Sequence, residues 1–185
     1  IYFQSLNVLK LNFYHKQKSS LHRIKEVKIL DLTPLDYNMN KMSVQMFISE
    51  LLYNSIKEEE ANPHLYDFLK NWIIDFRSAE IFDPNIHLQF MLELSKYLGF
   101  FPNSQLIHES ATFDLEEGIF KVSQPTESSL SPSHSLLFLR LLKKEDNFSN
   151  SERRVLMGIL LEYYRFHLHN FKEIKSKSVL EAVFS

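Results

Sequence analysis

The hydrophobic pattern of this chain changes its period once, near residue 31. Before that point, apolar and polar residues alternate within Arg23–Leu30 and within Leu6–Tyr14, where one face is formed by Leu9, Leu11 and Phe13. Alternation with a period of two is typical of strands that bury one face. The segment between them, residues 15–20, is polar. The first thirty residues therefore predict two strands joined by a loop.

These two strands are predicted to be the end of a larger β-domain. A lone pair of strands is marginally stable in water. The chain also begins at Ile1 rather than at a methionine, so we expect upstream residues to complete the domain. Residues 1–31 are assigned to this incomplete domain, and residues 32–40, which contain Pro34, to a linker.

Residues 41–185 are predicted to form a mainly α-helical domain, because their apolar residues recur at helical spacing. The helix expected over residues 41–57 would bury Met42, Met46, Phe47, Leu51, Leu52 and Ile56. Asn62-Pro63 and Asp83-Pro84 each combine a capping residue with a proline, which is typical of a helix start. Gly99 is expected to end the second of these helices.

The second half of this domain is expected to contain a short hairpin and three more helices. Residues 113–121 predict a hairpin that turns around Gly118, and residues 124–135, rich in serine and proline, predict a loop. Helices are expected at about 134–144, 151–169 and 177–184. Within the second of these, a buried stripe is predicted for Leu160, Tyr164, Leu168 and Phe171.

The composition offers little for catalysis. The chain has no cysteine and three glycines, which excludes disulfides, thiolate metal sites and a glycine-rich phosphate loop. His167 and His169 point to different sides of a helix, so they are not expected to share a metal ion. We expect no enzyme activity and no cofactor. The sequence shows neither a leader peptide nor an apolar run long enough to span a bilayer, which favours the cytoplasm.

Charge is distributed unevenly, with two basic ends around an acidic middle. Residues 1–30 carry six lysines and arginines and one acid, residues 50–83 carry three bases and eight acids, and residues 153–177 carry six bases and two acids. Basic ends favour an anionic partner, although solvated faces without a partner would give the same pattern.

Basic side chains in the first strands are interleaved with rings, which is typical of single-strand binding because cations neutralise phosphates and rings stack on bases. On a regular strand, Arg23 and Lys25 would share one face and Ile24 would take the other. The candidate DNA-binding residues here are Lys10, Tyr14, Lys16, Lys18, His22, Arg23 and Lys25. A second candidate, a basic ridge near the C-terminus, comprises Arg165, His169, Lys172 and Lys175.

Four stretches, in order along the chain, resemble the RecO family of bacterial recombination mediators. Residues 13–26 are similar to the closing strands of its N-terminal OB domain. Residues 95–103 and 113–120 are similar to the middle of its helical domain, and residues 163–180 to its last helix. The resemblance implies an OB barrel followed by an α-helical domain, with no catalytic centre.

The resemblance also implies a function in DNA repair and recombination. Members bind single- and double-stranded DNA, anneal strands, join RecR, bind the acidic C-terminal tail of single-stranded DNA-binding protein and help to load RecA. The implied location is the bacterial cytoplasm, in association with the nucleoid. A peptide-binding helical domain without DNA affinity is the alternative.

An acidic tail that ends in an aromatic residue and a carboxylate needs an apolar pocket rimmed by bases. The candidate pocket residues lie on the third predicted helix and are Leu88, Leu92, Lys96 and Tyr97. Some members of the family carry a four-cysteine zinc site near the stretch that is here 103–136. Because this chain has no cysteine, we expect apolar packing to replace the zinc site, through Phe113, Leu115, Ile119 and Phe120.

Overall fold

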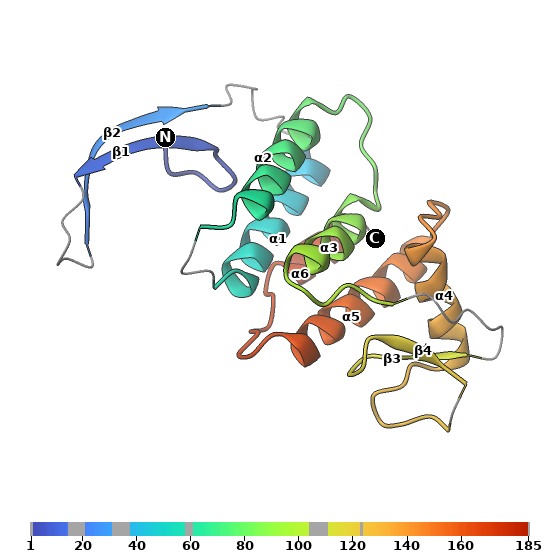
Figure 1. Cartoon of the computed structure of the whole chain (residues 1–185). Coiled ribbons are helices and arrows are strands. Elements are labelled where there is room, and N and C mark those ends of the chain that lie inside the picture. The colour runs from blue at the N-terminus through green and yellow to red at the C-terminus, as the bar shows by residue number, and fades with distance from the viewer. Residues whose placement is uncertain are drawn as a thin grey trace.

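The computed structural model describes residues 2–14, 21–30, 38–57, 61–103, 111–122 and 124–184. Figure 1 shows a hairpin that projects from one side of a group of packed helices, with a second, shorter hairpin at the opposite side. The elements, in chain order, are β1 (Leu9–Tyr14), β2 (Arg23–Ile29), α1 (Met39–Ser55), α2 (Pro63–Ser78), α3 (Ile86–Tyr97), β3 (Thr112–Asp114), β4 (Ile119–Lys121), α4 (Pro132–Leu142), α5 (Asn150–His167) and α6 (Lys177–Val183).

Strands β1 and β2 pair antiparallel, as the alternating pattern predicts, but the pairing contains a bulge. Phe13 lies opposite Ile24 while Asn12 lies opposite Glu26, so Lys25 is the extra residue. Regular alternation through Ile24 was therefore a wrong prediction. The cause is the spacing of Ile24 and Val27, which are three residues apart and reach the same face only if one residue is extra.

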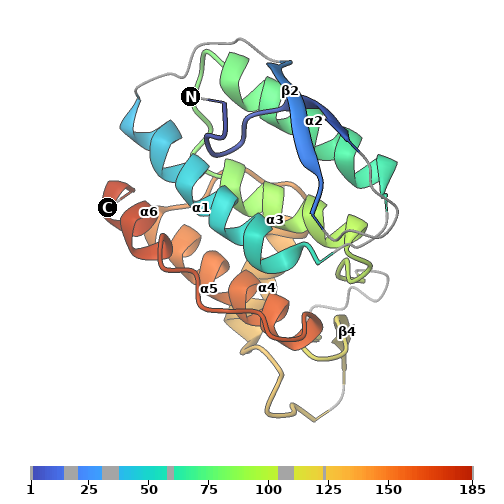
Figure 2. The same ribbon diagram turned by 90° about the vertical axis from the view of Figure 1, so that its left-hand side faces the viewer.

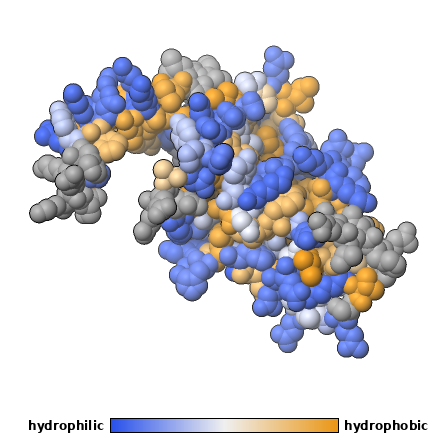
Figure 3. Space-filling model, in the orientation of Figure 1, coloured by the Kyte–Doolittle hydropathy of each residue, from blue (hydrophilic) through white to orange (hydrophobic). Residues whose placement is uncertain are grey.

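The bulge keeps the two faces of this hairpin chemically distinct. One face consists of the apolar pairs Leu9↔Ile29, Leu11↔Val27 and Phe13↔Ile24. Leu11, Phe13 and Ile24 of this face are exposed, whereas Leu9, Val27 and Ile29 are half-buried. Figure 3 shows hydrophobic colour along the lower side of the hairpin. The OB barrel to which the sequence assigns these strands stays a prediction, as do the domain boundaries.

Helix α1 buries only part of the predicted face, and the predicted Leu52 and Ile56 pack partly buried against the core. Its core positions are Val44, Phe47, Ile48 and Leu51, whereas Met42 and Met46 are 53% and 49% exposed. Phe47 and Leu51 were predicted correctly. The error arose because α1 is apolar on two sides, and periodicity alone did not show which side meets α6. The helix begins at Met39, after its cap Asn38, inside the segment assigned to the linker.

The start signal of α2 is confirmed, whereas α3 begins at Ile86 after Asn85, later than Asp83-Pro84 predicted, and no side chain caps it. The Asn62 side chain accepts a hydrogen bond from the Leu65 amide at 3.1 Å, and Pro63 occupies the first turn. Gly99, at a φ of +85°, ends α3. Amide donation from Gly99 to the Lys96 carbonyl and from Phe100 to the Ser95 carbonyl completes a Schellman motif.

Helix α5 lies at the centre of the helical domain. Leu160 and Tyr164 are fully buried, as predicted. The Tyr164 hydroxyl donates to the Met91 carbonyl and the Tyr163 hydroxyl to the Phe100 carbonyl, each at 2.6 Å, so α5 is tied to α3 and to the segment after it. Satisfied hydroxyls of this kind allow tyrosine to occupy a core.

Helices α4 and α6 lie close to their predicted positions, and the hairpin around Gly118 is confirmed. Ser131 caps α4, so the helix includes Pro132–Ser135, which were assigned to a loop. Gly118 adopts a φ of +70°, and a Cβ there would lie 2.7 Å from the Tyr163 hydroxyl. Both the turn and the close approach of Tyr163 therefore require glycine.

Candidate nucleic-acid and partner-binding surfaces

The outer face of the β1–β2 hairpin carries most of the first set of candidate DNA-binding residues. The register places three pairs on this face, Lys10↔Lys28, Asn12↔Glu26 and Tyr14↔Arg23. Lys25 at the bulge lies with its Nζ 5.8 Å from the centre of the Tyr14 ring. His22 stacks on Phe13, with the ring centres 5.5 Å apart. We call Lys10, Tyr14, His22, Arg23 and Lys25 the hairpin patch; Lys16 and Lys18 lie outside the described residues.

One acid belongs to the same face and is already neutralised. The Glu26 carboxylate pairs with Lys28 at 3.1 Å and accepts a hydrogen bond from the Asn12 amide at 2.9 Å. Charged residues of the hairpin patch are exposed. The face therefore presents net positive charge together with open rings, which is the combination that favours single-stranded nucleic acid.

The hairpin is fixed to the helical domain at its base. The Arg77 guanidinium of α2 donates to the Leu6 carbonyl at 3.1 Å and to the Asn7 side-chain oxygen at 3.0 Å. The Gln45 side chain of α1 donates to the Ser5 carbonyl at 2.9 Å, and Val8 is buried. These contacts hold the strands at a defined place beside α1 and α2.

The second basic region is not the helical ridge that the sequence predicted. Helix α5 ends at His167, and Asn170 adopts a left-handed φ of 60°. His169, Lys172 and Lys175 therefore lie in the segment between α5 and α6, whereas Arg165 lies in the last turn of α5 and pairs with Glu162 at 2.7 Å. The signal for this break was Asn170, since asparagine tolerates the left-handed conformation.

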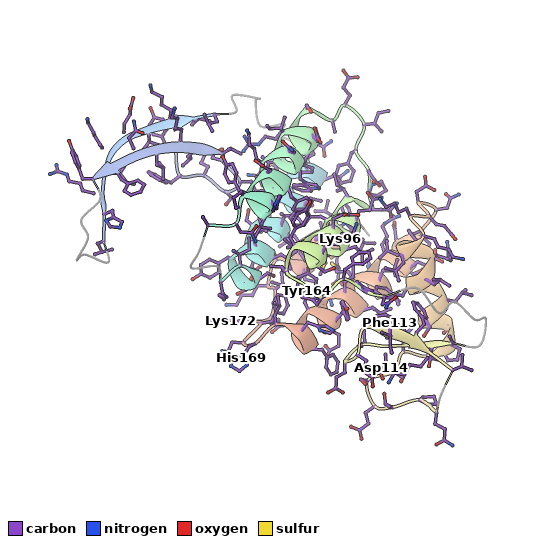
Figure 4. All side chains as sticks on the ribbon, viewed as in Figure 1. Lys96, Phe113, Asp114, Tyr164, His169 and Lys172 are labelled. Carbon is purple, nitrogen blue, oxygen red and sulfur yellow. The ribbon has the colours of Figure 1, made fainter. Side chains whose placement is uncertain are left out.

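A half-buried carboxylate, that of Glu50, holds this segment in place. Glu50 of α1 accepts hydrogen bonds from the Lys175 amide at 2.9 Å, and from the Ser176 amide and hydroxyl at 2.8 and 2.5 Å. These bonds lower the pKa of Glu50, although burial opposes them. Figure 4 shows His169 and Lys172 side by side, pointing away from the helices. We call His169, Lys172 and Lys175 the C-terminal patch.

Figure 2 shows the backbone of the two basic regions, with the hairpin in front of α2 and the segment between α5 and α6 below α1. The two ends of the chain therefore supply two separate basic regions, one on the hairpin and one between α5 and α6.

A pocket of about 160 Å³ lies between α3 and the end of α4, and includes two of the four predicted pocket residues, Leu92 and Lys96. Lys96 pairs with Glu93 at 2.7 Å, and its Nζ lies 4.7 Å from the centre of the Phe101 ring. Lys144 reaches the same Glu93 carboxylate at 3.7 Å. The other lining residues are Gln89, Leu141 and Leu142.

The remaining two predicted pocket residues are elsewhere. Leu88 is fully buried in the core because it lies on the inner face of α3, so including it in a surface pocket was wrong. Tyr97 lines a separate groove beside α2. Sequence reasoning missed Phe101, Leu141 and Lys144, since no periodic pattern indicates that α4 ends beside α3. We call the pocket of Leu92, Lys96, Phe101, Leu141 and Lys144 the two-lysine pocket.

The β3–β4 hairpin and the loop that follows it are held together by a buried carboxylate, that of Asp114. Phe113, Leu115 and Phe120 are buried, as expected. The Asp114 carboxylate also pairs with Lys121 at 2.9 Å, and accepts hydrogen bonds from the Thr126 hydroxyl at 2.7 Å and the Ser128 hydroxyl at 3.1 Å. The amides of Glu116 and Glu117 donate to the same carboxylate at 3.0 Å. Figure 4 shows Asp114 beside Phe113 at the edge of the short hairpin.

This environment favours the ionised carboxylate. The hydrogen bonds and the Lys121 ammonium hold the pKa of Asp114 well below its usual range, although burial opposes them. All of these partners lie in the hairpin or in the following loop, so the Asp114 carboxylate stabilises this part of the fold. Across the described ranges, no three histidine or acidic side chains come close enough to hold a metal ion.

Two histidines, His87 and His167, pack against aromatic rings inside the helical domain. Burial lowers the pKa of His87 to about 3, with a contribution from Arg153, so the ring is neutral between Phe47 and Phe184. His167 bonds to the Leu115 carbonyl at 2.9 Å and stacks on Phe100. Of the helices in the described part of the chain, none has both the length and the apolar character needed to cross a membrane.

Comparison with known proteins finds sequence similarity to one family. The family profile described as "Recombination protein O C terminal" matches residues 37–177. The DNA repair protein RecO of Flavobacterium psychrophilum is 38% identical, over all of this chain and 79% of the relative. RecO of Flavobacterium johnsoniae is 36% identical with the same coverage, and RecO of Bacteroides fragilis is 31% identical over all of this chain and 80% of the relative.

Proposed function

This chain belongs to the RecO family of DNA repair proteins, and we propose that it acts in DNA repair and recombination as a mediator without a catalytic centre. It binds single- and double-stranded DNA and anneals complementary strands. With RecR and single-stranded DNA-binding protein, it helps to load RecA. Its place of action is the bacterial cytoplasm, at the nucleoid. The observation that carries the proposal is the exposed face of rings and cations on β1 and β2.

The hairpin patch suits a single strand because it offers two kinds of contact. Lys10, Arg23 and Lys25 supply cations for phosphates, and the exposed Tyr14 ring supplies a surface for a base. Lys10 and Tyr14 lie on the same face of β1, so a phosphate contact and a base contact can follow one another along the strand. The C-terminal patch supplies further cations in a second region, between α5 and α6.

Replacing Tyr14 with alanine should weaken binding of a single-stranded oligonucleotide by about tenfold, because base stacking on an aromatic side chain contributes roughly 1–3 kcal/mol. The dependence of affinity on salt should stay unchanged, since no phosphate contact is removed. Fluorescence anisotropy of a labelled oligonucleotide measures both quantities. The matched control is Tyr53→Ala on α1, where the tyrosine is 78% exposed and lies outside both patches. Equal losses in the two variants would contradict stacking at Tyr14.

The two-lysine pocket suits the acidic tail of single-stranded DNA-binding protein. Leu92, Leu141 and Phe101 provide apolar surface for an aromatic side chain, and Lys96 and Lys144 provide cations for carboxylates. In the structure, the Glu93 carboxylate forms ion pairs with both Lys96 and Lys144. An incoming carboxylate would replace Glu93 as the partner of one or both lysines.

Reversal of both charges, in a Lys96→Glu and Lys144→Glu variant, should weaken binding of an acidic peptide that ends in phenylalanine by at least about tenfold, because like charges in one pocket repel. Isothermal titration calorimetry with the peptide provides the measurement. Lys143→Glu is the control, since Lys143 is exposed next to the pocket but does not line it. Unchanged affinity in the double variant would place the peptide elsewhere.

A peptide-binding domain without DNA affinity is the second candidate. The observation in its favour is that the two-lysine pocket is built from α3, α4 and Phe101, with no residue from the hairpin. Peptide binding together with absent oligonucleotide binding would support this candidate over the first.

A further inference from the structure

A second concave surface lies on the outer side of α2 and has the opposite charge. This groove, of about 400 Å³, is lined by residues of α2 and by Tyr97 at the end of α3. It shares no lining residue with the two-lysine pocket. We call it the α2 groove, and its residues are His64, Asp67, Phe68, Asn71, Trp72, Asp75 and Tyr97.

The floor of the α2 groove is a layer of stacked rings. Phe68 stacks on Tyr97 with ring centres 4.5 Å apart and an angle of 18° between the planes. Trp72 lies 4.4 Å from the buried Phe90 ring and stacks on Phe76 at 5.0 Å. These contacts fix Phe68 and Trp72 from below while both stay partly exposed, and Tyr97 is 38% exposed. The rings therefore form a rigid apolar surface that does not need to rearrange for a ligand.

The rim of the groove carries negative charge from two exposed carboxylates, those of Asp67 and Asp75. Asp67, Asn71 and Asp75 follow one another at intervals of four residues, so they form a stripe along one face of α2. Within the part of the chain that the structure describes, neither Asp67 nor Asp75 has an ion-pair partner, and both are exposed. Two carboxylates along an aromatic floor attract cations and repel phosphates.

We propose that the α2 groove binds an arginine-bearing basic segment of a partner protein, which goes beyond the function proposed above. A guanidinium group can stack on an aromatic ring and pair with a carboxylate at the same time, and it is more weakly hydrated than an ammonium group. The groove offers both surfaces within one helix. DNA and the acidic tail peptide are excluded as occupants by the charge of Asp67 and Asp75.

The chain contains one tryptophan, Trp72, so its fluorescence reports on the α2 groove directly. The probe is a peptide of three arginine–glycine repeats with blocked ends, titrated at about physiological salt. We expect a saturable change in Trp72 emission, and a smaller affinity for the peptide with lysine in place of arginine. Absence of a saturable change with the arginine peptide would overturn the proposal.

Variants separate this groove from general charge attraction. A double variant, Asp67→Asn and Asp75→Asn, should lower the affinity for the arginine peptide by about fivefold, because exposed ion pairs contribute roughly 0.2–1 kcal/mol each. The control, Glu127→Gln with Glu173→Gln, removes the same charge from exposed positions outside the groove and should bind as the unmodified protein does. Equal weakening in both variants would overturn the proposal. Because oligonucleotide binding depends on the hairpin patch, it should not fall in either variant, so the two proposals fail independently.

Discussion

Replacement of Asp114 by asparagine should lower the free energy of unfolding by about 2–4 kcal/mol, because each hydrogen bond to a buried charged group contributes roughly 1.5–3 kcal/mol. The side chain is 2% exposed and joins Lys121, two hydroxyls and two backbone amides. Asparagine keeps the size but loses the charge and one acceptor oxygen. The hairpin and the loop that follows it would then have unsatisfied donors.

Urea denaturation followed by circular dichroism measures this loss. Asp67→Asn is the matched control, since Asp67 is exposed on α2 and should change stability by less than about 0.5 kcal/mol. The pKa of Asp114 is lowered in the folded state, so its stabilising contribution is present above the unfolded pKa of about 4 and is lost as the pH falls below that value. The difference between the protein and the variant should therefore be largest near pH 7 and narrow below about pH 4. If the stability difference between the protein and the Asp114→Asn variant were the same at pH 7 and below about pH 4, the charge-based account would be contradicted.

Removal of three cations from the hairpin patch should have the largest effect on DNA binding. In a variant with Lys10→Gln, Arg23→Gln and Lys25→Gln, the slope of log affinity against log salt should fall by about 2, because each phosphate contact on a single strand contributes about 0.7. Affinity at physiological salt should fall by roughly tenfold to a hundredfold for the same reason. The folded state should be unaffected, since these side chains are exposed.

Fluorescence anisotropy of a labelled oligonucleotide at several salt concentrations measures both the salt slope and the affinity at physiological salt. The control variant removes the same number of positive charges outside the two patches, with Lys70→Gln, Lys143→Gln and Arg154→Gln. If the control lost as much affinity as the hairpin variant, the general charge of the protein rather than the hairpin patch would govern binding. A slope that stayed the same in the hairpin variant would place the phosphates elsewhere.

Local signals in the sequence predicted most of the helical domain. Asn62-Pro63 and Gly99 mark helix ends by mechanisms that depend on one or two residues, so they needed no tertiary information. The position of the short hairpin around Gly118 follows from the same kind of signal. The resemblance to RecO also lay in the sequence, and both the family profile and its relatives confirm it.

The features that sequence reasoning missed depend on contacts between distant elements. Helix α1 has apolar residues on two sides, and its contact with α6 decides that Val44 and Ile48 are buried while Met42 is exposed. The two-lysine pocket unites α3 with the end of α4, residues about fifty positions apart. The bulge at Lys25 was visible in principle, because Ile24 and Val27 have an odd spacing. Lys10, Tyr14 and Arg23 of the hairpin patch share one face, whereas His22 stacks on Phe13 of the apolar face. Contact of the patch with DNA stays a prediction.

The most direct test of the proposed function is the binding of a labelled single-stranded oligonucleotide to the protein, measured by fluorescence anisotropy from low to physiological salt. Binding through the hairpin and C-terminal patches predicts a log affinity that falls linearly with log salt, with a slope of about −2 or steeper for three or more phosphate contacts. Absence of binding at low salt, or an affinity that does not depend on salt, would contradict the proposal and leave the chain as a peptide-binding member of its family.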